Sequence, residues 1–239
     1  MSPPVFFSAD DAAVGETVVI AGDEGRHAAT VKRLRVGEAV DVTAGLGVRL
    51  VGEVVEVRRG AVAVEIRDRV EVARPQPTLT VVQALARGGR DEHAVEAMTE
   101  VGVDHVVGWE AARCVARWTD RTSAKWTTTA HGAAKQSRRV WWPQISGPAS
   151  TADVATRCKG ADLAVVLHEA ATAKLSSLEV PTAGRVVVVV GPEGGITDDE
   201  LEVLANASGR VVLLGGSVLR SSTAGVAALS VICAKTRWL

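Results

Sequence analysis

The sequence lacks the usual features of membrane, secreted and metal-binding proteins. Its longest apolar run is far too short to span a bilayer, and its first residues have neither the basic start nor the apolar core of a signal peptide. The three cysteines, Cys114, Cys158 and Cys233, are widely spaced and form no C-x-x-C pair. The five histidines are scattered without metal-ligand spacing. These absences predict reduced, buried thiols, no bound metal and a cytoplasmic location.

The sequence also lacks the glycine motifs of common nucleotide-binding folds, because it has neither a G-x-G-x-x-G after its first α/β strand nor a G-x-x-x-x-G-K-[ST]. A net charge of −1 argues against a general nucleic-acid coat. Between residues 113 and 139, however, seven basic residues accompany one acid, Asp120, and four of the six tryptophans lie in or just beyond this stretch. Trp118 and Trp126 are candidates to stack on an unpaired base, although buried packing is the favoured alternative.

Residues 1–73 have the pattern of a small, all-β domain. Short β-rich runs at 17–20, 39–42 and 49–57 are separated by glycines, and Arg58-Arg59-Gly60 is a plausible hairpin turn between 53–57 and 61–66. The pattern predicts a small barrel. Inside it, the basic segment 25–35 is expected to be partly helical, and is either a solvated helix face or an RNA contact.

Residues 74–77 contain two prolines one residue apart and are predicted to be a linker. Beyond them, strand and helix patterns alternate, which predicts a parallel α/β sheet. The expected strands are at 79–85, 104–109, 162–167, 186–190 and 211–214. The expected helices are at 91–101 and 121–138, with one beginning at the capping box of Thr197 and Glu200 and a last one capped by residues 221–223.

Two of these strands end in glycine-rich loops, Gly191–Gly195 and Leu214–Arg220, and a third ends in Leu167-His168-Glu169. The first two loops are expected to lie side by side at the carboxyl edge of the sheet, where open α/β sheets bind ligands. Glycines allow the backbone to approach a flat ligand, and exposed N–H and C=O groups can read the edge of a purine.

At these motifs the chain resembles the RsmE family of SPOUT-class RNA methyltransferases, which methylate N3 of one uridine in small-subunit (16S) ribosomal RNA. The resemblance covers nearly the whole chain. It is carried by GPEGGITDDE at 191–200, LGGSVLRSSTA at 214–224, GGR at 88–90, TEVGV at 99–103, QSRR at 136–139, and the Arg26-His27 pair followed by LRVG at 34–37.

The resemblance implies an α/β protein with a PUA-like β-barrel RNA-binding domain at 1–73 and a SPOUT methyltransferase domain at 78–239 that carries a C-terminal trefoil knot. It also implies a homodimer, which fits the apolar final helix, and S-adenosylmethionine bound by three loops. The implied cofactor-binding residues are Leu167, His168, Val190, Gly191, Pro192, Glu193, Gly194, Gly195, Leu213, Leu214, Gly215, Ser217, Val218 and Leu219.

Methyl transfer to uridine N3 requires loss of a proton, and the guanidinium of Arg220 is the candidate to stabilise the resulting charge or to hold a phosphate. The general base is not identified; Glu193 is the nearest carboxylate in sequence, and a backbone cap is its alternative role.

The candidate RNA contacts are Arg26, Lys32, Arg33, Arg35, Arg138 and Arg139.

The chain departs from the family at Ser221-Ser222, where Thr-Glu is usual, at Arg90, where lysine is common, and at Lys135, where glutamate is usual.

Two other functions stay open. One is a SPOUT ribose 2′-O-methyltransferase acting on rRNA or tRNA, against which the barrel and the TEVGV segment argue. The other is a non-catalytic RNA-binding protein of ribosome assembly, which the loss of the carboxylate at Ser222 favours and the two glycine loops oppose.

Overall fold

A computed structural model describes residues 3–239 of the chain, which divide into two compact units. The first contains the chain up to Arg74 together with residues 134–142, and the second contains residues 75–133 and 143–239. The sequence prediction assigned residues 134–142 to the second domain. In the structure this segment groups with the first unit, so that unit is built from two separate parts of the chain.

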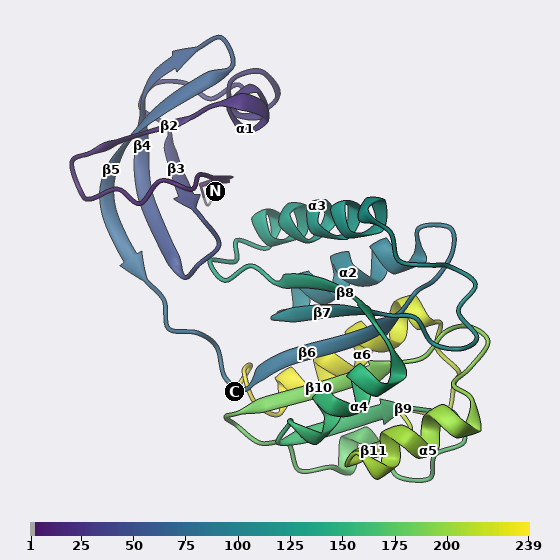
Figure 1. Cartoon of the computed structure of the whole chain (residues 1–239). Coiled ribbons are helices and arrows are strands. Elements are labelled where there is room, and N and C mark those ends of the chain that lie inside the picture. The colour runs from purple at the N-terminus through teal and green to yellow at the C-terminus, as the bar shows by residue number, and fades with distance from the viewer. Residues whose placement is uncertain (1–2) are drawn as a thin grey trace. The chain divides into compact units, whose positions relative to one another are not determined.

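The first unit is built on a mixed sheet with the strand order β1-β3-β4-β5-β2 (Figure 1). Its strands are β1 (Val5–Phe7), β2 (Thr17–Ile20), β3 (Ala39–Thr43), β4 (Val48–Arg58) and β5 (Ala61–Glu71). The predicted strands and the turn at Arg59-Gly60 are confirmed, whereas β1, which pairs in parallel with β3, was not predicted. The segment 25–35 is partly helical, as predicted: α1 (Gly22–Arg26) continues into a π-helical turn, η1 (His27–Val31).

Two tryptophans from the second part of this unit pack on glycines of the β3–β4 turn. A Cβ added at Gly47 would lie 2.2 Å from a ring carbon of Trp141, and one at Gly45 would lie 2.6 Å from a ring carbon of Trp142. The indole Nε1 of Trp141 donates a hydrogen bond to the Val72 carbonyl at 2.8 Å. The glycines at 45 and 47 are therefore needed to seat the two indole rings.

Replacing Gly47 with alanine is expected to destabilise the first unit by about 1–3 kcal/mol more than the same change at Gly60. Both glycines have positive φ, 94° and 78°, so both variants are strained. Only at Gly47 does the new methyl group meet an indole, since a Cβ at Gly60 has nothing within 4 Å. Urea unfolding followed by tryptophan fluorescence measures the difference, and equal losses in the two variants would contradict it.

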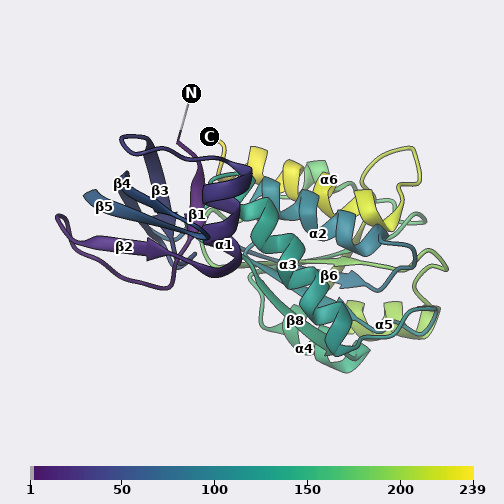
Figure 2. The ribbon, with the colours of Figure 1, turned by 90° about the horizontal axis from the view of Figure 1, so that it is seen from above.

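The second unit is built on a six-stranded, fully parallel sheet with the order β11-β9-β10-β6-β7-β8. Its strands are β6 (Thr78–Ala84), β7 (His105–Trp109), β8 (Gln144–Ala149), β9 (Leu163–Leu167), β10 (Arg185–Val190) and β11 (Gly209–Val212). Its helices are α2 (Arg90–Val101), α3 (Asp120–Gln136, of which the last turn groups with the first unit), α4 (Thr151–Lys159), the short 3₁₀ helix η2 (Leu175–Ser177), α5 (Asp198–Asn206) and α6 (Ser221–Ala234). Helices α2 and α6 cover one face of the sheet and α4 and α5 the other (Figure 2).

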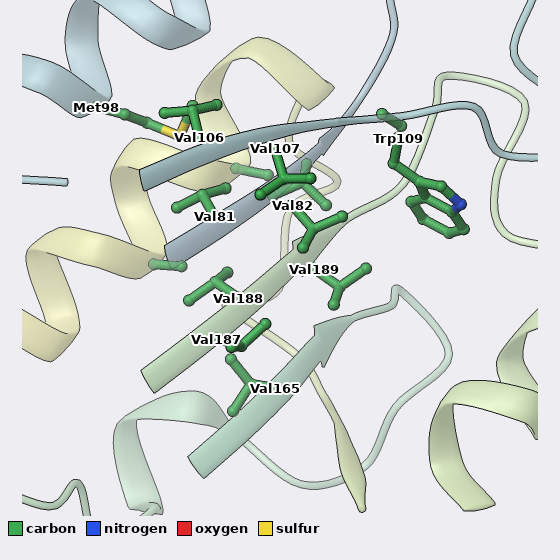
Figure 3. Close-up of a cluster of buried hydrophobic side chains, with 14 of the residues drawn as sticks. Val81, Val82, Met98, Val106, Val107, Trp109, Val165, Val187, Val188 and Val189 are labelled. Atoms are coloured by element: carbon green, nitrogen blue, oxygen red, sulfur yellow. The ribbon is translucent and has the colours of Figure 1, made fainter. Parts of the chain in front are cut away.

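The core of the second unit is a layer of β-branched side chains from the central strands (Figure 3). Val81, Val106, Val165 and Val188 are fully buried, as expected for strands covered on both faces. Met98 of α2 lies in the same cluster and approaches α6, where a Cβ at Gly225 would come within 2.6 Å of its sulfur. This close packing fixes α6, and with it the loop that precedes the helix.

The strand order separates the two strands that carry the glycine-rich loops. Strand β9 pairs with both β10 and β11 and lies between them, so the loops predicted to lie side by side do not follow adjacent strands. Strand β11 also ends earlier than predicted, at Val212, after which Leu213 forms a single parallel bridge with Lys174. The elements β8 and α4 were not predicted at all. The trefoil knot stays a prediction.

Within residues 3–239, no helix combines the length and apolar character needed to cross a membrane, and no group of histidine, cysteine and acidic side chains is arranged to hold a metal ion. All three cysteines are buried, as predicted. Burial raises the pKa of the Cys158 thiol to about 11.

Candidate functional site

A cavity of about 660 Å³ opens at the carboxyl edge of the parallel sheet in the second unit. It is formed by the segments that follow β9, β10 and β11, so the three predicted loops meet although their strands are not all neighbours. All the residues predicted to bind a cofactor line it: Leu167, His168, Val190, Gly191, Pro192, Glu193, Gly194, Gly195, Leu213, Leu214, Gly215, Ser217, Val218 and Leu219. The structure thus brings these residues together; their binding role stays a prediction.

The loop after β10 is shaped by its glycines. Gly195 has φ of 77°, and a Cβ at Gly191 would lie 2.6 Å from the Ile196 side chain, so both positions require glycine. Helix α5 then begins at the predicted capping box, in which Thr197 and Glu200 satisfy each other's backbone N–H groups. A rigid turn therefore connects the strand to the helix along one wall of the cavity.

The loop after β11 is held at its start and open at its glycines. Leu213 donates a hydrogen bond to the Ala173 carbonyl at 2.8 Å and accepts one from the Leu175 N–H at 2.9 Å. By contrast, a Cβ at Gly215 or Gly216 would meet nothing within 4 Å, and neither glycine has a positive φ. The fold itself does not require glycine there, so the missing side chains serve to keep the cavity wide.

The charged side chains around the cavity are of both signs. Arg113 donates a hydrogen bond to the Gly194 carbonyl at 2.9 Å, and Arg90 forms an ion pair with Glu193 at 3.1 Å. Arg220, the N-cap residue of α6, lines the cavity, and its guanidinium forms no hydrogen bond or ion pair with any residue that the structure describes. Arg220 is therefore the arginine of this site that is available to a ligand.

Ser221 adds an unsatisfied polar group to the same wall. The residue is 7% exposed, and its Oγ is buried without a hydrogen-bond partner among residues 3–239. A buried hydroxyl without a partner costs free energy, so a ligand that bonds to it gains from doing so. Ser221 is the first residue of the Ser221-Ser222 pair, at which the sequence departs from the family pattern.

The predicted RNA contacts all belong to the first unit. Those of the amino-terminal segment are exposed, namely Arg26, Lys32, Arg33 and Arg35. Arg26 pairs with Asp23 at 2.6 Å. Arg138 is exposed and has φ of 55°, just beyond the end of α3, while Arg139 is half-buried.

The two tryptophans considered for base stacking are packed into the second unit. Trp126 is fully buried, and its Nε1 donates to the Asp91 carboxylate at 3.2 Å, so the stacking prediction is wrong for this residue and the packing alternative is confirmed. Trp118 stands edge-on to it, with ring centroids 5.1 Å apart, and lies over Gly108 and Gly147. Trp118 is partly buried in this packing.

The sequence prediction missed Arg113 as a residue of the cavity. It lies in the segment after β7, about 80 residues before the glycine loop to which it bonds. Because all the strands are parallel, that segment also leaves the sheet at its carboxyl edge. The end of the predicted strand 104–109 was therefore a signal that pointed to Arg113.

Known proteins resemble this chain over nearly its full length. The sequence-family model for the RNA methyltransferase domain matches residues 74–233. The family model for the RNA methyltransferase PUA domain matches residues 20–67. The ribosomal RNA small subunit methyltransferases E of Mycobacterium bovis and Bacillus subtilis are 43% and 30% identical to it, covering 94% and 93% of this chain and 89% and 92% of their own lengths.

Solved structures agree with these sequence comparisons. A Legionella pneumophila protein whose structure holds the bound cofactor SAM is 25% identical, with a TM-score of 0.89 over 99% of both chains. The ribosomal RNA small subunit methyltransferase E of Neisseria gonorrhoeae, at 24% identity, has the same fold, with a TM-score of 0.90 over 98% of both chains. The chain belongs to the RsmE family, the ribosomal RNA small subunit methyltransferases E.

Proposed function

We propose that this chain transfers the methyl group of S-adenosylmethionine to N3 of a uridine in small-subunit (16S) ribosomal RNA. One observation carries the proposal: the cofactor-binding residues that the family resemblance implies, which come from three separate loops, line a single cavity. The relatives that cover almost the whole chain are ribosomal RNA small subunit methyltransferases.

The cavity fits S-adenosylmethionine in size and in chemistry. Its volume of about 660 Å³ lies in the usual range for small-molecule sites, and the open glycines of the β11 loop leave room for a flat adenine ring. The Ser221 hydroxyl offers a partner for a polar group of the ligand. When bound, S-adenosylmethionine supplies an activated methyl group on a sulfonium; the residues of the cavity bind and orient it and exclude water.

Gly215→Ala is expected to weaken S-adenosylmethionine binding by about 1–3 kcal/mol, because the new methyl group projects into the space that the ligand needs. Folding should be little affected, since a Cβ at this position meets no protein atom within 4 Å. Isothermal calorimetry measures the affinity. Gly132→Ala in α3, which also meets nothing within 4 Å and lies outside the cavity, is the matched control. Equal affinities for both variants would contradict the placement of the ligand.

Arg220 is the proposed catalytic residue. N3–H of uridine is a weak acid, and its loss leaves negative charge on O2 and O4, which a guanidinium without a protein partner can stabilise. Glu193 forms an ion pair with Arg90 at 3.1 Å, which ties its side chain to the start of α2. We therefore assign Glu193 to the shape of the glycine loop and leave the base to another group.

The proposal includes the RNA, the partner and the location. Residues 1–73 act as a PUA-like RNA-binding barrel and residues 78–239 as a knotted SPOUT domain. Half-buried Val226 and Val231 on α6, with exposed Val218 and Leu219 before it, support a homodimer that forms through this side of the second unit. Since ribosome assembly in bacteria is cytoplasmic, so is the enzyme.

The test is methylation of small ribosomal subunits isolated from a strain that lacks the enzyme. The protein is incubated with these subunits and methyl-labelled S-adenosylmethionine, and the product is mapped by primer extension. We expect label in the small-subunit RNA and one strong stop at a uridine, because an N3-methyl group blocks the pairing edge. A stop that occurs only at low nucleotide concentration would indicate a ribose 2′-O-methyltransferase. Donor binding without labelling of rRNA would favour a non-catalytic RNA-binding protein.

A further inference from the structure

A second cavity, of about 220 Å³, lies in the same unit and belongs to none of the predicted sites. One wall is the loop from β6 to α2, with Gly88 and Gly89, and the other is the segment from Ala116 into the first turns of α3. Both glycines have positive φ and open space at the Cβ position, so the loop bends sharply and presents backbone rather than side chains.

The walls of this cavity carry more positive than negative charge. Its basic residues are Arg117, Arg121 and Lys125, and its acids are Asp91 and Glu92. Glu92 is paired with Lys125 at 2.7 Å. The carboxylate of Asp91 accepts hydrogen bonds from the indole of Trp126 and from the Glu92 N–H, and burial raises its pKa.

The two arginines are left to act on a ligand. Arg121 forms no hydrogen bond or ion pair with the described residues, and Arg117 reaches only Glu110, at 3.8 Å. The hydroxyls of Thr119 and Thr122, which are hydrogen-bonded to each other at 3.0 Å, line the same cavity and leave one O–H to donate to a ligand. Two available guanidiniums with neighbouring hydroxyls form a donor set that matches a phosphate, which accepts several hydrogen bonds at once.

This cavity is next to the proposed methyl-donor site. The Arg90–Glu193 ion pair joins its glycine loop directly to the loop after β10. On the other wall, Arg113 lines the first cavity and Arg117, four residues further along the same irregular segment, lines the second. An RNA strand whose target base enters the first cavity therefore passes close to the second.

We propose that the cavity between the β6–α2 loop and the start of α3 holds a backbone phosphate of the substrate RNA beside the methylated nucleotide, through Arg117 and Arg121. The inference rests on the proposed function and deepens it. Phosphate contacts position a nucleic acid without reading its sequence. The cavity therefore fixes the position of the RNA strand relative to the methyl-donor site.

The test compares the double variant Arg117→Gln and Arg121→Gln with wild type and with Arg157→Gln, which removes an exposed arginine of α4 outside both cavities. Filter binding to small-subunit rRNA at several salt concentrations gives Kd and its salt dependence. We expect the double variant to raise Kd by about tenfold or more at low salt. The slope of log K against log salt should fall by about one or two units. The control and the affinity for S-adenosylmethionine should be unchanged.

The outcomes separate this inference from the proposed function. An unchanged Kd and salt slope in the double variant would overturn the phosphate site while leaving the methyltransferase in place. Wild type that binds rRNA but transfers no methyl group would contradict the proposed function, and the salt-slope comparison would still decide the phosphate site. If thermal unfolding shows the double variant to be unstable, the single Arg121→Gln variant, which removes no hydrogen bond or ion pair with the described residues, repeats the comparison.

Discussion

Arg220→Ala is expected to lower the rate of methyl transfer to small ribosomal subunits by about 10²–10³. The guanidinium lines the donor cavity at the start of α6 and has no partner in the described chain, so its charge is directed at whatever enters. A donor that faces developing negative charge stabilises the transition state more than the ground state, which lowers kcat. Single-turnover rates with saturating donor and RNA measure this step.

The controls for Arg220 separate chemistry from folding and binding. Calorimetry should show nearly unchanged S-adenosylmethionine affinity in Arg220→Ala, and Arg220→Lys should recover part of the rate, because it restores the charge without the planar fork. Arg210→Ala, which removes an exposed arginine of β11 outside the cavity, should behave as wild type. If Arg220→Ala transfers methyl groups at the wild-type rate, the arginine has no part in the mechanism.

The sequence was most informative where local chemistry alone determines the structure. Thr197 and Glu200 form a capping box where a helix begins, and the β-branched valine run at 186–190 favours a strand covered on both faces. The glycine loops were recognisable for the same reason. Because these features lie at strand ends of a parallel sheet, the sequence also predicted that the two glycine-rich loops would meet, whereas the full set of cofactor-binding residues came from the family resemblance.

The features that the sequence did not reveal depend on distant parts of the chain. Strand β8 contains Gly147-Pro148 and is only partly buried at the edge of the sheet, so its own residues do not read as a strand. Trp141 and Trp142 pack on Gly47 and Gly45, which are almost 100 residues earlier, and no local pattern indicates that pairing. The position of β9 between β10 and β11 is likewise a matter of topology, which periodicity cannot predict.

Glu200 forms hydrogen bonds to three separate segments of the second unit, at Ala112, Thr151 and Thr197. Glu200→Ala is therefore expected to destabilise this unit by about 3 kcal/mol. The residue is 7% exposed, and its carboxylate accepts four hydrogen bonds: from the Ala112 N–H at 2.8 Å, the Thr151 hydroxyl at 3.0 Å, and the N–H and hydroxyl of Thr197, both at 3.1 Å. Its loss leaves part-buried donors without their partner at the starts of two helices and beside Arg113. For a unit of this size the unfolding midpoint should fall by about 10 °C, as measured by calorimetry. Glu202→Ala, on the exposed side of the same helix, should change it little.

The effect of Glu200 should also depend on pH in a defined direction. Burial alone would raise the pKa of this carboxyl, but the hydrogen bonds from Ala112, Thr197 and Thr151 outweigh it and lower the pKa below its usual value of 4.5. A lowered folded-state pKa stabilises the protein fully above the unfolded value, and this stabilisation is lost as the pH falls through the folded value. The variant Glu200→Gln keeps the shape of the side chain but cannot ionise. The difference in unfolding free energy between wild type and this variant should therefore be constant near neutral pH and shrink below about pH 4.5. A difference that stays the same in acid would show that shape, and not the charge of the carboxylate, holds the two helix starts together.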